Sequence, residues 1–390
     1  MGTGLRYNAR DMEEQRKALW QGARPLIGTV VGVGIFGLPY VFSQAGYVYG
    51  AIELIIVAAL SLLTYSIFSD LLAINKGHVR FVAVVSNQLG PLGRLIASLA
   101  FFGSLWGALL AYIIVGGQFF GNILRPLIGG NVFHYQVAFW LLASICMVGG
   151  TLFVRRLQAT LIPVFFVMIA ALTLFALPNL HIEYLTAVEP TNILLPFGAL
   201  IFAFSGFSAV PELREALGRR KGLVRASLVL GVLLVAVLYA LFCFAIVGMT
   251  GPFTSMQAVD GLRFVAGPWL SIFVSIIGLC TVFTAYVSVG NSVMNSLIYD
   301  FRGRFLSSWW LAVTIPLCLF LFGARDFIDV IGTTGGLLGG LCGIVLLVAY
   351  ERARLTAQLP KRALAVPQGL VALSFVLFAA MIILTIVEIA

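Results

Sequence analysis

Charged residues are scarce in this sequence. Asp, Glu, Lys and Arg together make up 10% of its 390 residues, whereas ordinary soluble proteins carry about 25%. Hydrophobic residues make up 61% of the chain, and the mean hydropathy is +1.05. This composition excludes a soluble globular protein and predicts an all-α polytopic membrane protein.

Residues that commonly build catalytic and metal sites are also few. The sequence has three histidines, all expected near loops, and it has no H-E-x-x-H motif. Its five cysteines fall inside apolar stretches and have no metal-ligand spacing. The first twenty residues are polar and charged, so no cleavable signal peptide is expected. We therefore expect neither an intramembrane enzyme nor an organic cofactor.

Eleven hydrophobic segments follow one another along the chain. A helix needs about 20 apolar residues to cross the hydrocarbon core of a bilayer. The predicted spans are 23–46, 49–73, 95–124, 133–153, 158–177, 193–213, 223–249, 266–297, 308–323, 327–350 and 367–389. The first ten form two units of five helices, and the eleventh is expected to be peripheral.

The basic residues predict the orientation of these spans. When the 24 Lys and Arg residues are assigned to alternating sides of eleven spans, 21 fall on one side and only Arg125, Arg263 and Arg325 on the other. Basic loops stay in the cytoplasm, so we expect a plasma (inner) membrane protein with a cytoplasmic N-terminus and an extracellular or periplasmic C-terminus. The formal charge of +9 then reflects topology and attraction to membrane lipid, not nucleic acid binding.

This topology divides the chain into six expected parts. They are a cytoplasmic N-terminal arm (1–21), a first five-helix repeat (22–177), an extracellular loop (178–192), a second, inverted five-helix repeat (193–350), a cytoplasmic loop (351–366) and the eleventh helix (367–390).

The first span, ARPLIGTVVGVGIFGLPYVFSQAG, is unusual because it contains helix-breaking residues, namely Gly28, Gly32, Gly34, Gly37 and Pro39. Inside a helix glycine costs about 1 kcal/mol and proline about 3 kcal/mol relative to alanine, and lipid offers no water to the freed backbone groups. We expect the helix to open near 33–36 and to offer amides and carbonyls to a ligand. Residues 32–37 also match G-x-G-x-x-G, but no strand precedes them, so a nucleotide site is rejected. Close helix packing through the glycines is the alternative.

The sixth span repeats this pattern. Gly206-Phe-Ser-Ala-Val-Pro211 and Gly34-Ile-Phe-Gly-Leu-Pro39 share a glycine, a small residue three positions later and a proline five positions later. The two spans occupy corresponding places in the two units and cross the membrane in opposite directions. Paired interrupted spans are typical of secondary transporters with inverted repeats, which bind their substrate at the breaks. A simple proline kink is the alternative.

A polar stripe follows one face of the eighth span. Its members, spaced three and four residues apart, are Thr281, Thr284, Ser288, Asn291 and Asn295. The stripe should face the bundle interior, where its oxygens would suit Na⁺ or would bond neighbouring helices. Glu53, near the outer end of the second span, is open to two interpretations, a proton carrier or a structural group.

With these residues identified, the chain resembles the amino acid–polyamine–organocation superfamily, and within it the amino acid/auxin permease branch and the bacterial aromatic amino acid permeases. The resemblance is carried by GTVVGVGIFGLPYVFSQAG (28–46) and FAFSGFSAVPEL (202–213), with looser support from SLIYD (296–300). It implies a five-plus-five inverted-repeat fold over roughly 22–350 and secondary transport of amino acids or similar amines. Some proton-coupled relatives have a lysine in the fifth span, but 158–177 contains no cation.

The breaks and the polar stripe together predict the binding sites. The expected substrate-binding residues are Val33, Gly34, Ile35, Phe36, Gly37, Trp106, Phe202, Ser205, Gly206, Phe207, Ser208 and Tyr286. The expected ion-binding residues, for Na⁺, are Thr29, Gly32, Thr284 and Ser288. None of these side chains is charged, so a charged substrate side chain would be buried without a partner, which is unfavourable.

The predicted function is an ion-coupled symporter of neutral or aromatic L-amino acids that works by alternating access. The coupling ion is Na⁺ or H⁺. Two alternatives remain open: an amino acid sensor or receptor that keeps the transporter fold, and a transporter of another small amine.

Overall fold

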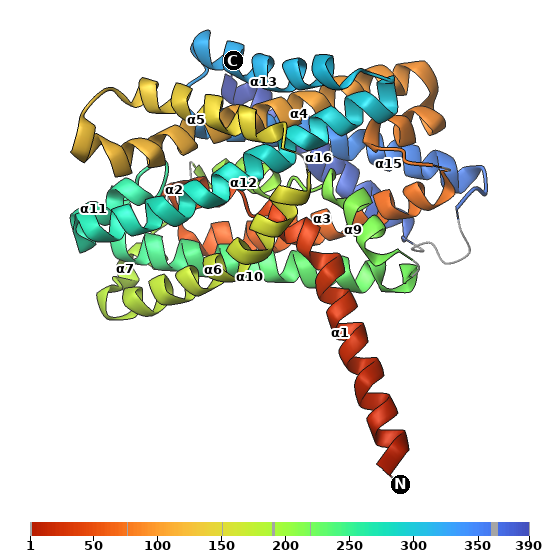
Figure 1. Ribbon diagram of the computed structural model, residues 1–390, viewed down its shortest axis with the longest axis horizontal. Helices are drawn as coiled ribbons and strands as arrows, with labels where there is room; N and C mark the ends of the chain where they lie inside the picture. Colours follow the sequence, from red (N-terminus) through yellow and green to blue (C-terminus); the bar gives the residue numbers. More distant parts are fainter. Residues whose placement is uncertain are drawn as a thin grey trace.

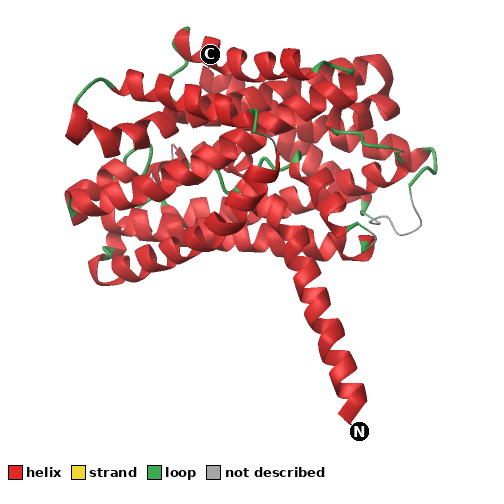
Figure 2. Cartoon of the chain, in the orientation of Figure 1, coloured by secondary structure: helices red, strands yellow, loops and turns green. Residues whose placement is uncertain are grey.

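The computed structural model describes residues 2–75, 77–149, 151–188, 192–218, 220–359 and 366–389. Nearly all of these residues lie in helices and none lies in a strand (Figures 1 and 2). The all-α fold predicted from composition is confirmed. Residues 189–191 of the predicted extracellular loop and 360–365 of the predicted cytoplasmic loop lie outside the described residues.

Long apolar helices alternate with short connecting helices and turns. The α-helices are α1 (Gly2–Val30), α2 (Gly34–Ala45), α3 (Tyr47–Ile74), α4 (Phe81–Ile128), α5 (Val132–Met147), α6 (Thr151–Ala176), α7 (Ile182–Thr186), α8 (Leu195–Ala203), α9 (Ala209–Leu217), α10 (Val224–Thr250), α11 (Val259–Ala266), α12 (Pro268–Phe301), α13 (Phe305–Leu321), α14 (Phe327–Thr333), α15 (Gly340–Leu355) and α16 (Gln368–Ile389). The 3₁₀ turns are η1 (Leu177–Asn179), η3 (Lys221–Leu223) and η4 (Gly251–Phe253), and η5 (Thr334–Gly339) is a π-helical segment.

The described helices include seven that are long and apolar enough to cross a membrane, or eight if the bent pair α1 and α2 forms one span. Two shorter apolar helices, α5 and α13, coincide with predicted spans. The predicted span 133–153 is too long at its end, because α5 stops at Met147 and a turn follows at 148–149. The protein is a multi-pass membrane protein, and the count of eleven spans stays a prediction.

The first span is broken as the sequence predicts, but at 31–33, slightly before the predicted 33–36, because the helix resumes at Gly34. The helix α1 ends at Val30, α2 begins at Gly34, and their axes differ by 63°. The regular hydrogen bonding of the α-helix stops there, because the N–H of Gly32 bonds to the carbonyl of Val30, 2.8 Å away. The sixth span is broken as well, since α8 ends at Ala203 and α9 begins at Ala209.

The halves of the two broken spans pack in pairs. The segment α2 packs against α8, and α1 packs against α9. The long helices α4 and α12 lie against each other, and α10 covers α1, α2 and α3. The N-terminal part of α1 projects from the bundle in Figure 1.

The helix α16 lies on the glycine-rich face of η5 and α15. A β-carbon on Gly336 would lie 2.0 Å from the hydroxyl of Thr385, and one on Gly343 would lie 2.5 Å from the ring of Phe378. These glycines let α16 approach closely, as glycine-rich faces do in membrane bundles.

Candidate functional site

The two breaks contact each other inside the bundle. A β-carbon on Gly34 would lie 2.7 Å from the Cα atom of Ala203, and one on Gly206 would lie 2.7 Å from the Cγ2 atom of Val30. Val30 and Ala203 are the last residues of α1 and α8. Because neither glycine position has room for a side chain, the backbone groups of both breaks are brought side by side.

Two buried tyrosines bond to these broken ends. Tyr65 on α3 donates its hydroxyl proton to the carbonyl of Phe204 and accepts the N–H of Gly206 at 2.8 Å. Tyr239 on α10 has its hydroxyl 2.7 Å from the carbonyl oxygen of Val30 and 2.9 Å from that of Ala203. A helix end leaves backbone groups without helical partners, so the tyrosines supply bonds that lipid and an apolar core cannot.

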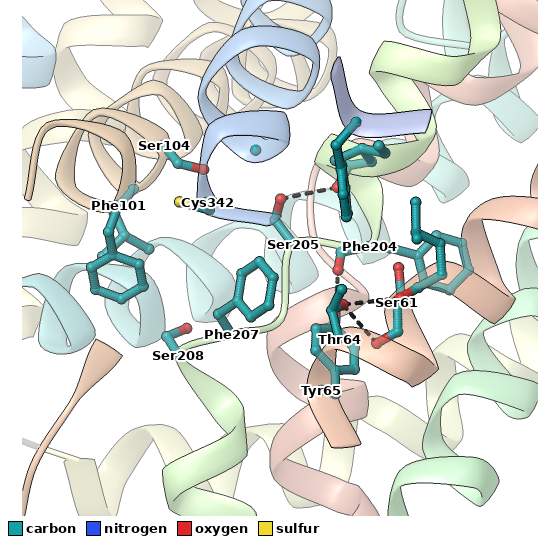
Figure 3. A pocket seen from close by; sticks show the side chains of 15 residues that line it. Ser61, Thr64, Tyr65, Phe101, Ser104, Phe204, Ser205, Phe207, Ser208 and Cys342 are labelled. Atoms are coloured by element: carbon teal, nitrogen blue, oxygen red, sulfur yellow. Dashed lines mark hydrogen bonds between the residues drawn. The ribbon is translucent and has the colours of Figure 1, made fainter. Parts of the chain in front are cut away.

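A cavity of about 30 Å³ borders the break of the sixth span (Figure 3). The ring of Phe207 lies between Phe101 and Thr64, and its centroid is 5.5 Å from that of Tyr65. Five hydroxyl-bearing residues besides tyrosine line the space, namely Ser61, Thr64, Ser104, Ser205 and Ser208. None of the described lining residues is charged. The cavity has room for a water molecule or two, so an amino acid requires the surrounding helices to move apart.

A second cavity, of about 20 Å³, lies between α1, α6 and α12. Gly28 and Val31 border it from the end of α1, and Thr281 and Thr284 border it from α12. The hydroxyl of Thr281 donates to the carbonyl of Ile277 and that of Thr284 to the carbonyl of Thr281, both at 2.9 Å. Each hydroxyl has thereby used its proton, so its oxygen keeps only lone pairs for a further partner. A space of this size holds one water molecule or one small ion.

The family described as "Transmembrane amino acid transporter protein" matches residues 15–386. The chain belongs to this family. It is an amino acid transporter of the membrane and not an enzyme.

Two bacterial relatives extend over most of the transporter. Glutamine transporter 2 of Aliivibrio fischeri is 25% identical over 335 residues, which cover 82% of this chain and 85% of that protein. Tyrosine-specific transport system 1 of Haemophilus influenzae is 23% identical over 364 residues, which cover 85% of this chain and 88% of that protein.

Two solved structures share the fold of the transporter. Mhp1, a nucleobase-cation-symport-1 family transporter in a closed conformation with bromovinylhydantoin bound, has a TM-score of 0.66 at 16% identity and matches 95% of this chain and 89% of its own. MhsT in complex with L-phenylalanine has a TM-score of 0.66 at 14% identity and matches 94% of this chain and 98% of its own. At these identities the likeness shows the fold alone.

Several predicted substrate residues lie together in the transporter. Val33, Gly34 and Ile35 are buried at the start of α2. The ring of Phe202 would lie 3.3 Å from a β-carbon on Gly34. In the sixth span, Ser205, Phe207 and Ser208 line the cavity at the break, and Gly206 bonds to Tyr65 beside it.

Other predicted substrate residues lie elsewhere. Phe36 packs in an aromatic cluster, with its centroid 4.7 Å from Phe119 and 5.8 Å from Phe242. The hydroxyl of Tyr286 lies 3.0 Å from that of Ser144 on α5. The ring of Trp106 is tilted against that of Phe102, with centroids 5.6 Å apart, and Gly37 packs against Ile331 and Phe327 of α14. These four residues pack between helices in this arrangement, and their role in binding stays a prediction.

The predicted ion-binding residues likewise do not all lie together. Thr284 lines the small cavity at the end of α1. Thr29 and Ser288 are buried but do not border this cavity, and Gly32 lies instead against the hydroxyl of Tyr112. Thr281, a member of the predicted stripe, takes the place beside Thr284 because residues three apart share a helix face.

Several side chains that surround the breaks are not among the residues predicted from the sequence. Ser61, Thr64 and Tyr65 share one face of α3, and their spacing of three and four residues in an apolar span was a detectable signal. Tyr239 carried a weaker signal, a single tyrosine in a long apolar run. Nothing in its local sequence indicates that the hydroxyl reaches two other helices.

Arg80 makes polar contacts between helices at one end of the sixth span. Arg80 precedes α4, and its side chain lies 3.4 Å from the carboxylate of Glu215 on α9. Its backbone N–H donates to the carboxylate of Asp300 at the end of α12, at 3.1 Å. A space of about 10 Å³ remains between these groups and the break, lined by Arg80, Phe207 and Ser208 among others.

The opposite end of the sixth span borders a much larger cavity, of about 480 Å³. Its walls come from α2, α8, α14 and α16. A tight contact limits it toward the break, since a β-carbon on Gly335 would lie 2.1 Å from the carbonyl oxygen of Gly198. The space near Arg80 is therefore far smaller than the cavity at the opposite end of the sixth span.

Proposed function

We propose that this transporter is an ion-coupled symporter of neutral or aromatic L-amino acids that works by alternating access. The observation that carries the proposal is the small cavity where the end of α1 faces Thr281 and Thr284. It adjoins the break in the first span, so an ion there would act on the same backbone that holds the substrate.

The chemistry of this cavity favours a hard cation. The C-terminal end of a helix carries partial negative charge on its carbonyl groups, and α1 ends there at Val30. The two threonine hydroxyls donate their protons to α12, so they offer oxygen lone pairs. Oxygen ligands of this kind suit Na⁺ better than a soft metal. A bound ion would link α1 to α12.

The breaks supply complementary ends for an amino acid. Its carboxylate would bind the N-terminus of α2 near Gly34, where the helix dipole favours an anion. Its ammonium group would donate to carbonyls at the ends of α1 and α8. Its side chain would extend toward the cavity lined by Ser205, Phe207 and Ser208, whose described lining has no charge. A charged side chain buried there would lack a partner.

The names of related proteins agree with this substrate class. Two relatives are named for glutamine and tyrosine transport, and a solved structure of the same fold holds L-phenylalanine. All three are amino acids with an uncharged side chain.

The two ends of the bundle fit an alternating-access cycle. We assign the end closed by Arg80 and Glu215 to the cytoplasm, because basic connections concentrate on that side. The hollow end at α8 and α14 would then face outward. Transport requires the hollow end to close and the Arg80 contacts to separate.

Uptake by purified protein in liposomes tests the proposal. Labelled glutamine, leucine and phenylalanine are offered with an inward Na⁺ gradient, with a proton gradient, or with neither. We expect the Na⁺ gradient to drive accumulation, and an excess of lysine or glutamate to compete weakly. Stronger competition by lysine or glutamate than by the neutral amino acids would overturn the substrate class. Accumulation driven by the proton gradient alone would overturn Na⁺ coupling.

A further inference from the structure

Tyr239 contacts both broken spans through a single atom. It lies in the middle of α10 and is fully buried. Its hydroxyl oxygen is 2.7 Å from the carbonyl oxygen of Val30 and 2.9 Å from that of Ala203. These residues end α1 and α8, which belong to different halves of the chain and meet only through folding.

The hydroxyl of Tyr239 cannot donate to both carbonyls at once. A tyrosine hydroxyl has one proton, so it donates to one of the two carbonyls at a time. The other carbonyl then keeps a lone pair for a different donor. Both oxygens stay within hydrogen-bond distance of one point, although helix-end carbonyls carry like partial charges that repel each other.

Tyr65 makes the corresponding contact from the other side of the sixth span. Its hydroxyl donates to the carbonyl of Phe204 and accepts the N–H of Gly206. The two tyrosines therefore bond to the backbone at 203, 204 and 206 from α10 and from α3. No other side chain among the described residues bonds to the backbone at both breaks.

We propose that Tyr239 is a positioning residue for substrate binding. Its hydroxyl holds the carbonyl ends of α1 and α8 together, so that the ammonium group of the amino acid meets acceptors already in place. Tyr65 supports the same geometry within the sixth span. This inference rests on the proposed binding of the ammonium group at these ends.

The uncharged lining of the break makes this geometry important. The described cavity residues include no carboxylate that could receive an ammonium group, so uncharged acceptors, the backbone carbonyls and hydroxyl oxygens, must receive it. Their alignment then sets the affinity, because ordering them before binding lowers the cost of binding. Loss of the hydroxyl would remove the donor that these two carbonyls share, although the carbonyl of Val30 would still accept the N–H of Gly32, and would let the two ends separate.

The test compares three tyrosine-to-phenylalanine variants in liposomes. For Tyr239→Phe we expect the KM for a neutral amino acid to rise about tenfold, the usual scale for one lost buried hydrogen bond, while kcat changes less than about twofold. Tyr65→Phe should raise KM in the same direction. Tyr135→Phe is the control, because that hydroxyl also donates to a backbone carbonyl, at Gly129, but far along the chain from both breaks.

The melting temperature of each purified variant, with and without substrate, separates positioning from general stability. We expect substrate to stabilise the control as it does the wild type and to stabilise Tyr239→Phe less. An unchanged KM for Tyr239→Phe, or an equal rise for Tyr135→Phe, would overturn it. If Tyr239→Phe does not fold, an unchanged KM in Tyr65→Phe overturns it instead. A wild type that transports no neutral amino acid contradicts the proposed function, which is a separate result.

Discussion

The Cα atom of Ala203 lies 2.7 Å from the position that a β-carbon would occupy on Gly34. The neighbour is a backbone atom, so it cannot turn aside as a flexible side chain would. The two broken spans therefore approach each other through a position that only glycine fits. This contact joins residues 169 positions apart in the sequence and makes a first prediction about transport.

Gly34→Ala should lower the rate of amino acid uptake by about tenfold or more, because overpacking at this contact forces the breaks apart. Gly34→Val should abolish uptake. Protein levels in the membrane are measured in parallel and should fall less than activity. Gly222→Ala is the matched control, since a β-carbon there has no atom within 4 Å. Wild-type uptake by Gly34→Ala would contradict the close contact.

The second prediction concerns the cavity proposed to bind Na⁺. Thr281→Ala and Thr284→Ala each remove one hydroxyl oxygen that faces the end of α1. Each should raise the Na⁺ concentration for half-maximal uptake by about tenfold, since bonds to charged groups are worth more than neutral ones. The double variant should lose its dependence on Na⁺.

Thr173→Ala on α6 is the control for this experiment. Its hydroxyl also donates to the carbonyl four residues earlier, at 2.8 Å, but it does not border the described cavity. Unaltered Na⁺ dependence in the double variant would exclude this site.

The third prediction separates Na⁺ from H⁺ coupling. Glu53 on α3 is buried, and its Oε2 atom has no hydrogen-bond partner in the described part of the chain. Glutamine has nearly the same size but cannot carry a proton. We expect Glu53→Gln to keep both its Na⁺ dependence and its pH profile of uptake between pH 5 and 8. Loss of proton-driven uptake in this variant alone would identify Glu53 as the proton carrier.

The fourth prediction tests orientation. Gly222 lies in the exposed connection between α9 and α10, which the basic residues assign to the cytoplasm. A membrane-impermeant thiol reagent applied to intact cells should not label Gly222→Cys. Val188→Cys, in the connection predicted to be extracellular, is 47% exposed and should be labelled. The parent protein, with its five native cysteines, sets the background. The reverse pattern would invert the topology.

The sequence by itself determined the fold class and the two breaks. Charged residues are too few for a soluble protein. A glycine or proline inside an apolar span destabilises the helix at that position, and this effect can be read from the local sequence. The ends of α1 and α8 therefore fall close to where Gly34 and Gly206 predict them. The predicted stripe on the eighth span likewise included both threonines that line the small cavity at the end of α1, because helical spacing alone sets a face.

Only the tertiary structure decided which side chains meet these breaks. Phe36, Trp106 and Phe207 are all predicted from the sequence to bind substrate. In the structure, Phe36 packs against Phe119 and Trp106 packs against Phe102. Tyr239 bonds to carbonyls 209 and 36 residues away. Such contacts depend on the rotation of each helix about its axis and on how α3, α4 and α10 pack around the broken spans. In uniformly apolar helices almost any face can be buried, so periodicity does not define that rotation.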